Sequence, residues 1–436
     1  MTAAPDRRSL VIDGARLIDG TGNPAIEDSV LVIVGDRITE FGPRGRVRVP
    51  PDATVIDGRE KTVLPGLIDV HVHDSSDENM ALYVKNGVTS IRFAGGEQAS
   101  LLALRGRVER EEIPGPRIFS VGHPVDATPH AWPGSKAVDS PIEARRLIRR
   151  LVEEDQADAI LATHRVSRSV LTAIVETAHE LGVPVTGQTW TAGPDDILAA
   201  GIDGLENTSR IPESAAWPLE RLFRYRSVSE RLAHLAHLWV DADWDRTTEL
   251  AHQFAEAGIA LAPELVSFEG WARTNDAEVK SDRDWPQQPG NPQVIGYERH
   301  VDYLTVDWSD ADYTAQAQAV DRYREFCRIF HRAGGLLVAG TDMGFGGILL
   351  HRELWHFQQA GLTPIEAIRT GARAAASALA IEDLGQIAQG SRADVVVVAG
   401  NPAQDLAALR NVEDVLIGGR PVVRAGALIQ PVGAQR

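Results

Sequence analysis

Cysteine, aromatic residues and positive charge are all scarce in this chain of 436 residues. It has one cysteine, Cys327, and 6% aromatic residues, and 44 Lys and Arg against 61 Asp and Glu give a formal net charge of −17. A single cysteine excludes a disulfide scaffold and a zinc site built from several cysteines. The excess of negative charge argues against a nucleic-acid partner and against docking on an anionic membrane, because both require a cationic surface.

Long apolar runs are missing as well. No segment approaches the roughly 18 apolar residues of a membrane-spanning helix, and the first residues lack the apolar segment of a secretion signal. We therefore expect a cytoplasmic protein. With 43% hydrophobic residues the chain can bury a large core, and its length suits a few domains or one large barrel with an accessory module.

Short β-branched segments separated by turns occur at both ends of the chain. Near the start they cover residues 9–12, 15–18, 29–34 and 37–41, and near the end residues 394–398, 412–417 and 421–423. Asp-Gly pairs between the first segments are typical of hairpins. The central part lacks this pattern, so we predict one sheet domain assembled from residues 1–65 and 386–436.

The central residues 66–385 alternate short apolar strands with helical segments. Strand patterns cover residues 67–70, 88–93, 159–161, 183–186, 204–206, 259–261 and 336–339, and helical patterns cover residues 80–86, 142–152, 169–181, 195–200, 247–257 and 313–333. The alternation predicts a parallel sheet, and its length suits an eight-stranded α/β barrel. Residues 105–140, 208–245 and 265–312 do not fit, so we expect long loops there that build or cover an active site.

Two histidines, His71 and His73, give the strongest chemical signal. Because successive side chains of a strand alternate faces, both imidazoles point the same way and are rooted about 7 Å apart. Such a pair can converge on one divalent ion at the carboxyl end of a barrel strand, where barrel active sites form. The alternative is two polar residues at a strand end with no joint function.

A carboxylate, Asp342, follows the last predicted strand in the segment Gly340-Thr341-Asp342. At the end of an apolar strand it can bind a cation or accept a proton from water. The alternative is an aspartate that caps the following turn.

Further segments accompany these residues, namely 17–22, 65–69, 86–92, 115–118, 351–354, 385–390 and 393–397. Together with His71, His73 and Asp342 they resemble the amidohydrolase superfamily, most closely its imidazolonepropionase- and prolidase-like branch, over nearly the whole chain. The resemblance implies a distorted (β/α)8 TIM barrel with a composite β-sandwich domain formed by both termini. It also implies one or two divalent ions that activate water against amide, lactam or ester bonds.

The metal site of the resembled family is only partly present, although its first-strand and last-strand ligands are matched. The resemblance implies a carboxylated, metal-bridging lysine on the fourth strand and histidines after the fifth and sixth. These positions hold Leu161, Gln188 and Asn207. Leucine cannot be carboxylated and amide carbonyls bind zinc weakly, so a lysine-bridged binuclear centre is not expected.

Two interpretations of this altered site stay open. In the first, His71, His73 and Asp342 hold a single divalent ion, zinc being the most suitable, and Asp342 is also the general base. In the second, no metal is bound and the same three residues perform acid–base catalysis, while Gln188 and Asn207 orient the substrate.

Other residues are candidates for the same pocket. His164 follows the fourth strand and His130 lies in a preceding loop, so either can complete the metal site or contact the substrate. Arg92, near the end of the second strand, is a further candidate, with a structural ion pair as the alternative.

Trp190 would share the face of Gln188, and other tryptophans recur in the expected loops: Trp132, Trp217, Trp271, Trp285 and Trp308. Aromatic walls favour an apolar or aromatic ligand, with loop packing as the alternative.

The sequence therefore predicts an enzyme that hydrolyses a small amide, lactam or ester substrate with one metal ion or none. A metal-independent lyase, isomerase or cyclase that uses His and Asp as acid–base groups is an alternative, and a non-catalytic small-molecule binding protein is another. A homo-oligomer is compatible with the resemblance, although no segment identifies an interface.

Overall fold

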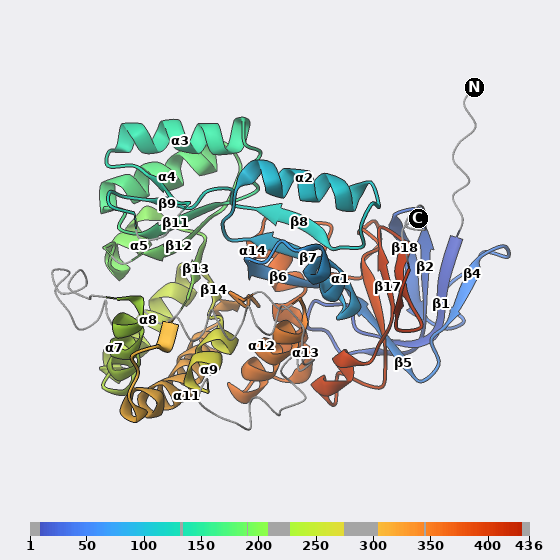
Figure 1. The fold of residues 1–436 in the computed structure, drawn as a ribbon. Helices are drawn as coiled ribbons and strands as arrows, with labels where there is room; N and C mark the ends of the chain where they lie inside the picture. The colour runs from blue at the N-terminus through green and yellow to red at the C-terminus, as the bar shows by residue number, and fades with distance from the viewer. Residues whose placement is uncertain are drawn as a thin grey trace.

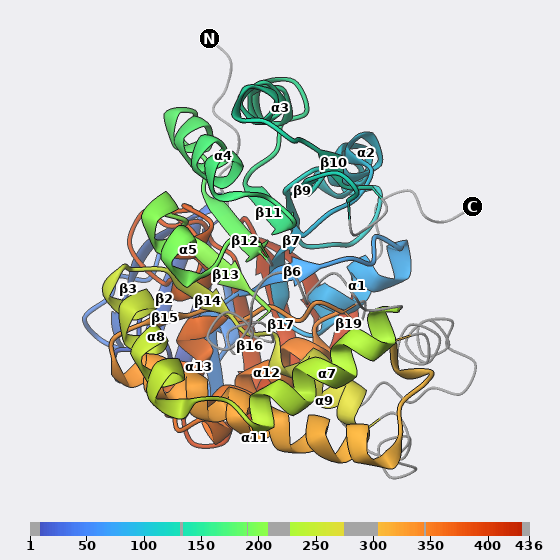
Figure 2. The same cartoon turned by 90° about the vertical axis from the view of Figure 1, so that its left-hand side faces the viewer.

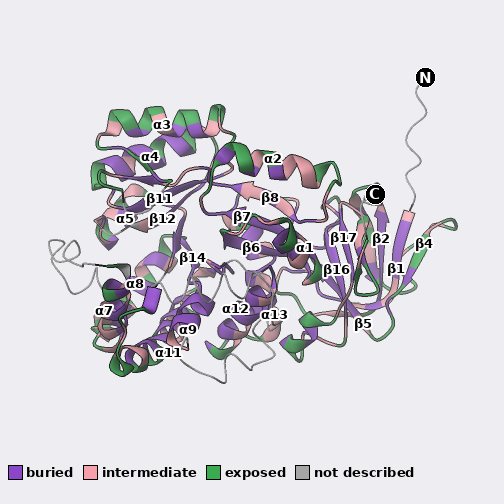
Figure 3. Ribbon diagram, in the orientation of Figure 1, coloured by how far each residue is buried: buried purple, intermediate pink, exposed green. Residues whose placement is uncertain are grey.

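The computed structural model describes residues 9–130, 134–189, 191–207, 227–273, 304–343 and 346–429. Strands from the two ends of the chain lie together on one side of the molecule, and the helix-rich central part lies on the other (Figure 1). Buried residues follow the strands and the inner faces of the helices (Figure 3).

The terminal sheet contains nine strands among the described residues. They are β1 (Ser9–Leu17), β2 (Ile26–Val34), β3 (Arg37–Pro43), β4 (Thr54–Asp57), β5 (Lys61–Pro65), β16 (Val395–Ala399), β17 (Val412–Ile417), β18 (Arg420–Arg424) and β19 (Ala427–Leu428). β5 connects the two ends of the chain, because it pairs in parallel with β1 and antiparallel with β16. Both termini therefore share one sheet, while the domain limits at residues 65 and 386 stay a prediction.

Four consecutive valines in β16 reflect its position between two apolar cores. Val395 and Val397 pack into the core of the terminal sheet, whereas Val396 and Val398 pack into the larger core that includes the barrel. A strand that is buried on both faces is expected to be apolar at every position. The terminal sheet is thus packed directly against the barrel.

Eight parallel strands of the described residues form the barrel. They are β6 (Leu67–Val72), β7 (Val88–Phe93), β8 (Arg117–Ser120), β11 (Ile160–His164), β12 (Val185–Thr189), β13 (Gly204–Glu206), β14 (Ala260–Ala262) and β15 (Leu336–Leu337). Their ladders form two sheets, one of β6 to β8 and one of β11 to β15, with the short β9 (Val125–Asp126) and β10 (Lys136–Ala137) at the edge of the second. Backbone hydrogen bonds from Val70 to Ala339 (3.1 Å) and from Asp158 to Ser120 (2.8 Å) link the two sheets. This is the predicted distorted (β/α)8 barrel, although the described ladders do not close it.

The chain passes from the terminal sheet to the barrel at Gly66. A Cβ atom here would collide with the side chain of Thr89 on β7, and the Gly66 amide donates to the carbonyl oxygen of Asp394 at 2.8 Å. Only glycine allows this approach, which explains the glycine before the first barrel strand.

Helices surround the barrel strands (Figure 2). They are α1 (Asp77–Lys85), α2 (Gln98–Glu109), α3 (Pro141–Glu153), α4 (Arg168–Glu180), α5 (Pro194–Ala200), α7 (Val228–Val240), α8 (Trp244–Glu256), α9 (Leu265–Ala272), α11 (Asp310–Arg332), α12 (Ile348–Gln359), α13 (Pro364–Thr370) and α14 (Arg373–Ala378), with a 3₁₀ helix, η4 (Leu406–Arg410), before β17. α3 begins with a proline after Ser140, whose side chain accepts the Glu143 amide, a usual helix start. None of the described helices has the length and hydropathy needed to cross a membrane.

The three stretches expected to be long loops contain regular elements in their described parts. Residues 105–140 include the end of α2 and all of β8, residues 208–245 include α7, and residues 265–312 include α9 and the start of α11. The expectation of loops was wrong for these parts. β8 has four residues and begins with the charged Arg117, and α2 contains Gly106, so neither element has a clear periodic pattern.

Candidate active site

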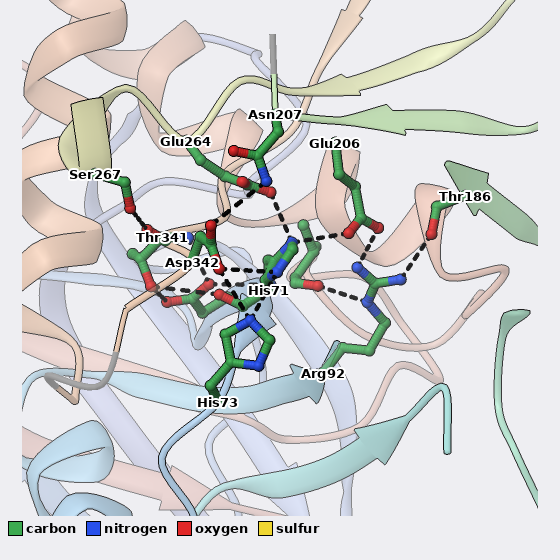
Figure 4. A network of polar contacts seen from close by, with 12 residues as sticks. His71, His73, Arg92, Thr186, Glu206, Asn207, Glu264, Ser267, Thr341 and Asp342 are labelled. Carbon is green, nitrogen blue, oxygen red and sulfur yellow. Dashed lines mark hydrogen bonds and ion pairs between the residues drawn. The ribbon is translucent and has the colours of Figure 1, made fainter. Parts of the chain in front are cut away.

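His71, His73 and Asp342 meet at the carboxyl end of the first barrel strand (Figure 4). The Nε2 atoms of the two histidines lie 3.1 Å apart. Oδ1 of Asp342 lies 2.9 Å from Nε2 of His73 and 3.1 Å from Nε2 of His71. His71 is buried, whereas the side chain of His73 is 49% exposed, so the cluster opens to solvent on the His73 side. The convergence expected from the sequence is present, and the roles of the three residues stay a prediction.

Close contacts between β6 and the segment after β15 bring Asp342 to the histidines. A Cβ atom on Gly340 would lie 3.1 Å from Cβ of His71, so glycine allows the two segments to approach. The Asp342 amide donates to the carbonyl oxygen of His71 at 2.9 Å. Buried Asp69 accepts hydrogen bonds from Oγ1 (2.9 Å) and the amide (3.1 Å) of Thr341. Burial raises the pKa of Asp69 to about 7, although these hydrogen bonds oppose the shift.

Two further carboxylates face the other ring nitrogen of His71. Nδ1 of His71 lies 2.8 Å from Oε2 of Glu206 and 2.7 Å from Oε1 of Glu264. Both glutamates are buried. Glu206 ends β13 and Glu264 follows β14 after one proline, so both come from the carboxyl ends of barrel strands.

Arg92 lies inside the barrel and pairs with Glu206. Its guanidinium donates to a carboxylate oxygen of Glu206, to Oγ1 of Thr186 at 3.0 Å and to the carbonyl oxygen of Val70 at 2.5 Å. The side chain is 1% exposed, and these contacts are all within the protein. The structure therefore favours the structural ion pair over a direct contact of Arg92 with substrate.

Neighbouring charges set the protonation of this centre. Burial disfavours an imidazolium at His71, but the carboxylates of Glu264, Asp342 and Glu206 raise its pKa well above the ordinary value. Burial would also raise the pKa of Asp342, but the two histidines hold it well below its usual range. Burial raises the pKa of Glu264 to about 8. At Glu206, Arg92 and His71 outweigh burial and lower the pKa to about 2. Glu264 is therefore the carboxyl group that retains a proton most readily.

Three residues of the centre have a left-handed backbone. The angle φ is 61° at Asn207, 57° at Glu264 and 52° at Asp342. This conformation costs a non-glycine residue about 1–2 kcal/mol, and such residues cluster at functional sites. Nδ2 of Asn207 donates to Oδ2 of Asp342 at 3.4 Å, so Asn207 contacts the centre.

The other predicted site residues lie in different environments. Gln188 is half-buried on β12. His164 ends β11 and is buried, with Nδ1 4.0 Å from Oδ2 of Asp126. His130 is exposed in the loop after β9, and Trp190 lies outside the described residues. Contacts of these four residues with substrate stay a prediction.

The position of the expected bridging lysine is apolar. Leu161 on β11 is buried in a small cluster with Ala94, Val121 and Ala159. An apolar side chain in an apolar cluster offers no ligand atom, so this position cannot bridge two ions.

The tryptophans that the structure describes in the expected loops contribute to packing. Trp271 on α9 is buried, and its ring centroid lies 4.8 Å from that of Phe268. Nε1 of Trp308 donates to the carbonyl oxygen of Ser229 at 3.0 Å. The others lie outside the described residues: Trp132, Trp190, Trp217 and Trp285. For Trp271 and Trp308 the structure favours packing over an aromatic wall.

Sequence reasoning did not single out Glu206 or Glu264. Glu206 was assigned only to the strand 204–206, and Glu264 was assigned to no element, because it lies between the strand 259–261 and the expected loop 265–312. Each glutamate ends or closely follows an apolar strand, as Asp342 does. Because the carboxyl ends of barrel strands meet at one rim, this shared position was a signal that could have identified both.

The sequence profile of the amidohydrolase family matches residues 62–422 of this chain. The chain belongs to the amidohydrolase family. The resemblance inferred from the sequence is thus confirmed, and the matched range extends from β5 through the whole barrel into β18.

Relatives of this amidohydrolase match it over limited segments. An N-acyl-D-aspartate deacylase from Alcaligenes xylosoxydans xylosoxydans is 35% identical over 117 residues, which are 26% of this chain and 22% of the relative. An imidazolonepropionase from Alkaliphilus metalliredigens (strain QYMF) is 41% identical over 96 residues, 20% of this chain and 23% of the relative. The chain thus matches less than a quarter of the length of these curated relatives.

A solved Xaa-Pro dipeptidase with bound methionine shares the fold, with 21% identity, a TM-score of 0.68 and coverage of 95% of this chain and 99% of that one.

Members of the amidohydrolase family usually bind divalent metal ions, and two groups of described residues offer suitable atoms. His71, His73 and Asp342 provide two imidazole nitrogens and a carboxylate oxygen, which fits a mononuclear site with open positions. The second group joins Nδ1 of His71 to Glu206 and Glu264. Nδ1 of His71 and the carboxylate oxygens that face it are buried without a well-directed hydrogen bond. However, the guanidinium of Arg92 already balances the negative charge of Glu206. The first group therefore fits a metal ion better than the second.

Proposed function

We propose that this amidohydrolase hydrolyses a carbon–nitrogen bond in a small molecule with one divalent ion, zinc being the most suitable, held by His71, His73 and Asp342. The observation that carries the proposal is the convergence of three ligand atoms within 3.1 Å of one another at the rim of the barrel. The name of the deacylase relative supports a substrate with an acyl–nitrogen bond.

The two ring nitrogens of His71 have separate tasks in this proposal. Nε2 faces His73 and Asp342 and is the ligand atom. Nδ1 lies within ion-pair distance of Glu206 and Glu264. With an ion on Nε2, donation from Nδ1 to one of these carboxylates would fix the tautomer and raise the basicity of the ligating histidine. Since the pKa of Glu206 is lowered to about 2, Glu206 stays ionised and is the stronger acceptor.

The open side of the centre is where substrate and water meet. A divalent ion there would supply Lewis-acid activation of water and of a carbonyl group. Oδ1 of Asp342 faces the histidines, whereas Oδ2 is oriented by the Asn207 amide at 3.4 Å. Asp342 is therefore placed to accept the proton of the attacking water, and half-exposed His73 borders the entry side.

Elemental analysis and assays of metal-free protein test this proposal. We expect close to one equivalent of zinc per chain, loss of hydrolysis of N-acetylated amino acids and small lactams after chelation, and recovery when zinc is added. Two equivalents per chain would contradict the single-ion site. Full turnover by the His71→Ala variant would remove this centre from consideration.

A metal-independent lyase, isomerase or cyclase is the second candidate, and Glu264 favours it. Burial raises the pKa of Glu264 to about 8, so a carboxylic acid beside an imidazole can exchange protons with a substrate without an ion. Full turnover by chelated protein, together with loss of turnover on Glu264→Gln, would support this candidate and refute the first.

A further inference from the structure

Glu264 directly precedes α9, yet its side chain does not cap that helix. It occupies the N-cap position with φ 57° and ψ 44°, whereas N-cap residues usually have an extended backbone. An acidic side chain at this position ordinarily accepts hydrogen bonds from the first-turn amides. Glu264 instead points its carboxylate at Nδ1 of His71, 2.7 Å away (Figure 4).

The first-turn amides of α9 are bound by Glu353, which belongs to α12. Its Oε1 accepts from the amide of Leu265 at 3.1 Å, and its Oε2 accepts from the amide of Val266 at 2.8 Å. Glu353 is completely buried. A carboxyl group from a different helix therefore accepts from the amides that lie nearest to Glu264 in the chain.

Two more contacts fix α9 between α12 and the centre. Oγ of Ser267 donates to the carbonyl oxygen of Thr341 at 2.6 Å, directly before Asp342. Glu269 accepts two hydrogen bonds from the guanidinium of Arg352 on α12, at 2.8 and 2.6 Å. α9 is thus held by α12 both at its first turn and at Glu269, and by the strand end that bears Asp342 at Ser267.

We propose that Glu353 is a positioning residue for the active site. By binding the first-turn amides of α9, it leaves the carboxylate of Glu264 free to face His71 and keeps the Glu264 backbone left-handed. The inference rests on the proposed function, because it gives Glu264 a part in the centre formed around His71. Without Glu353 the two amides lose their acceptor, and the adjacent Glu264 carboxylate turns toward them and away from the imidazole.

The kinetic test compares one substitution in two backgrounds. Glu353→Gln keeps the size of the side chain but replaces one acceptor oxygen with a donor. We expect it to lower kcat for N-acetylated amino acids about tenfold, with KM nearly unchanged, because a supporting residue of a ligating histidine is weakened. In a Glu264→Gln background the same substitution should lower kcat less than about twofold. Equal losses in both backgrounds would overturn the positioning role.

Glu366→Gln is the matched control. Glu366 also accepts a backbone amide at a helix start, that of Thr363 at 2.8 Å, but on α13 and outside the centre. This variant should retain the kcat of the wild type. His71→Ala separates the two proposals: full turnover by this variant would remove the proposed function, whereas an inactive His71→Ala protein alongside a fully active Glu353→Gln protein would remove only the positioning role.

A structural readout needs neither substrate nor metal. In a crystal structure of Glu353→Gln, the Glu264 carboxylate should have left His71 and should contact the amide of Leu265 or Val266. An unchanged Glu264 would overturn the proposal.

Two variants at residue 264 serve if Glu353→Gln does not fold. Glycine adopts φ near 57° without strain, so Glu264→Gly should unfold at a higher temperature than Glu264→Ala. The difference in unfolding temperature should exceed the general preference of N-cap positions for glycine over alanine. A more stable alanine variant would show that the left-handed backbone needs no support, and the proposal would fail.

Discussion

His71 presents a different set of acidic partners at each ring nitrogen. Nε2 faces His73 and the partly exposed Asp342, while Nδ1 faces the fully buried Glu206 and Glu264. In the proposed function, this division would separate ligand chemistry on the open side from control of the imidazole proton on the closed side. His71 would then act as a ligand although Leu161, Gln188 and Asn207 occupy the positions where further ligands were expected.

Removing either histidine of the centre should abolish function without unfolding the protein. We expect His71→Ala and His73→Ala each to lower hydrolysis of the best N-acetylated amino acid by about a hundredfold or more, because each change deletes a ligand atom. Initial rates and bound zinc are measured on the same samples. His252→Ala, at an exposed position of α8, is the control and should retain both. A fully active His73→Ala protein would reduce the centre to His71 and Asp342.

Arg92 should matter for stability more than for chemistry. Its ion pair with Glu206 is buried on both sides, so Arg92→Met leaves a buried carboxylate with only His71 as a charged partner, at a cost of up to about 3–5 kcal/mol. Denaturant unfolding measures this loss. The double variant Arg92→Met with Glu206→Gln should recover much of it, because the buried charge is then gone. Equal stability of the single variant and the wild type would show that Glu206 is already neutral.

The candidate site was predictable only where a sequence pattern has a geometric meaning. Strand alternation identified His71 and His73, and the end of an apolar strand identified Asp342. Glu206 and Glu264 were not identified, because a single glutamate at or just after the end of a short strand resembles any other polar residue there. Their contact with His71 depends on the tertiary arrangement of the barrel strands, whose carboxyl ends meet at one rim.

One buried acid contributes to holding the segment that bears Asp342 against β6. Asp69 accepts the Thr341 hydroxyl at 2.9 Å, so Thr341→Val deletes a donor to a buried carboxyl group. We expect a loss of about 1–3 kcal/mol in the free energy of unfolding and, as Asp342 loosens from the histidines, a lower kcat. Thr341→Ser keeps the hydroxyl and is the matched control. Equal stability of the two variants would show that the amide of Thr341 alone holds this contact.

Elements with strong periodicity were predictable, and those set by tertiary contacts were not. The helices expected at 142–152, 169–181 and 313–333 are present as α3, α4 and α11. α7 and α9 lie within expected loops, and α9 is short and begins after a left-handed residue. Its first turn depends on Glu353 from α12, a contact that local sequence cannot reveal.

Two buried histidines on α12 link the stability of the whole molecule to pH. Burial, with the charge of Arg410, lowers the pKa of His351 to about 4, and Nε2 of His351 lies 2.9 Å from the carbonyl oxygen of Asn86. Burial also lowers the pKa of His356 to about 4, although Glu269 opposes this shift. In the unfolded chain a histidine has a pKa of about 6.5. The unfolded state therefore binds more protons between these values, and both histidines reduce stability as the pH falls from about 6.5 to 4.

His351→Gln should remove one of these two contributions. Glutamine can keep the N–H donation to Asn86 but cannot titrate, so the slope of the unfolding free energy against pH should fall by about 1.4 kcal/mol per pH unit in the acid window, relative to the wild type. Urea unfolding at several pH values measures both slopes. Asp69 and Glu264 act in the opposite direction there, because their raised pKa values favour the folded state as the pH falls. Their contribution is common to both proteins and cancels in the comparison. An unchanged slope would mean that His351 is protonated within the folded protein, which its Nε2–H donation to Asn86 allows because the second proton binds at Nδ1.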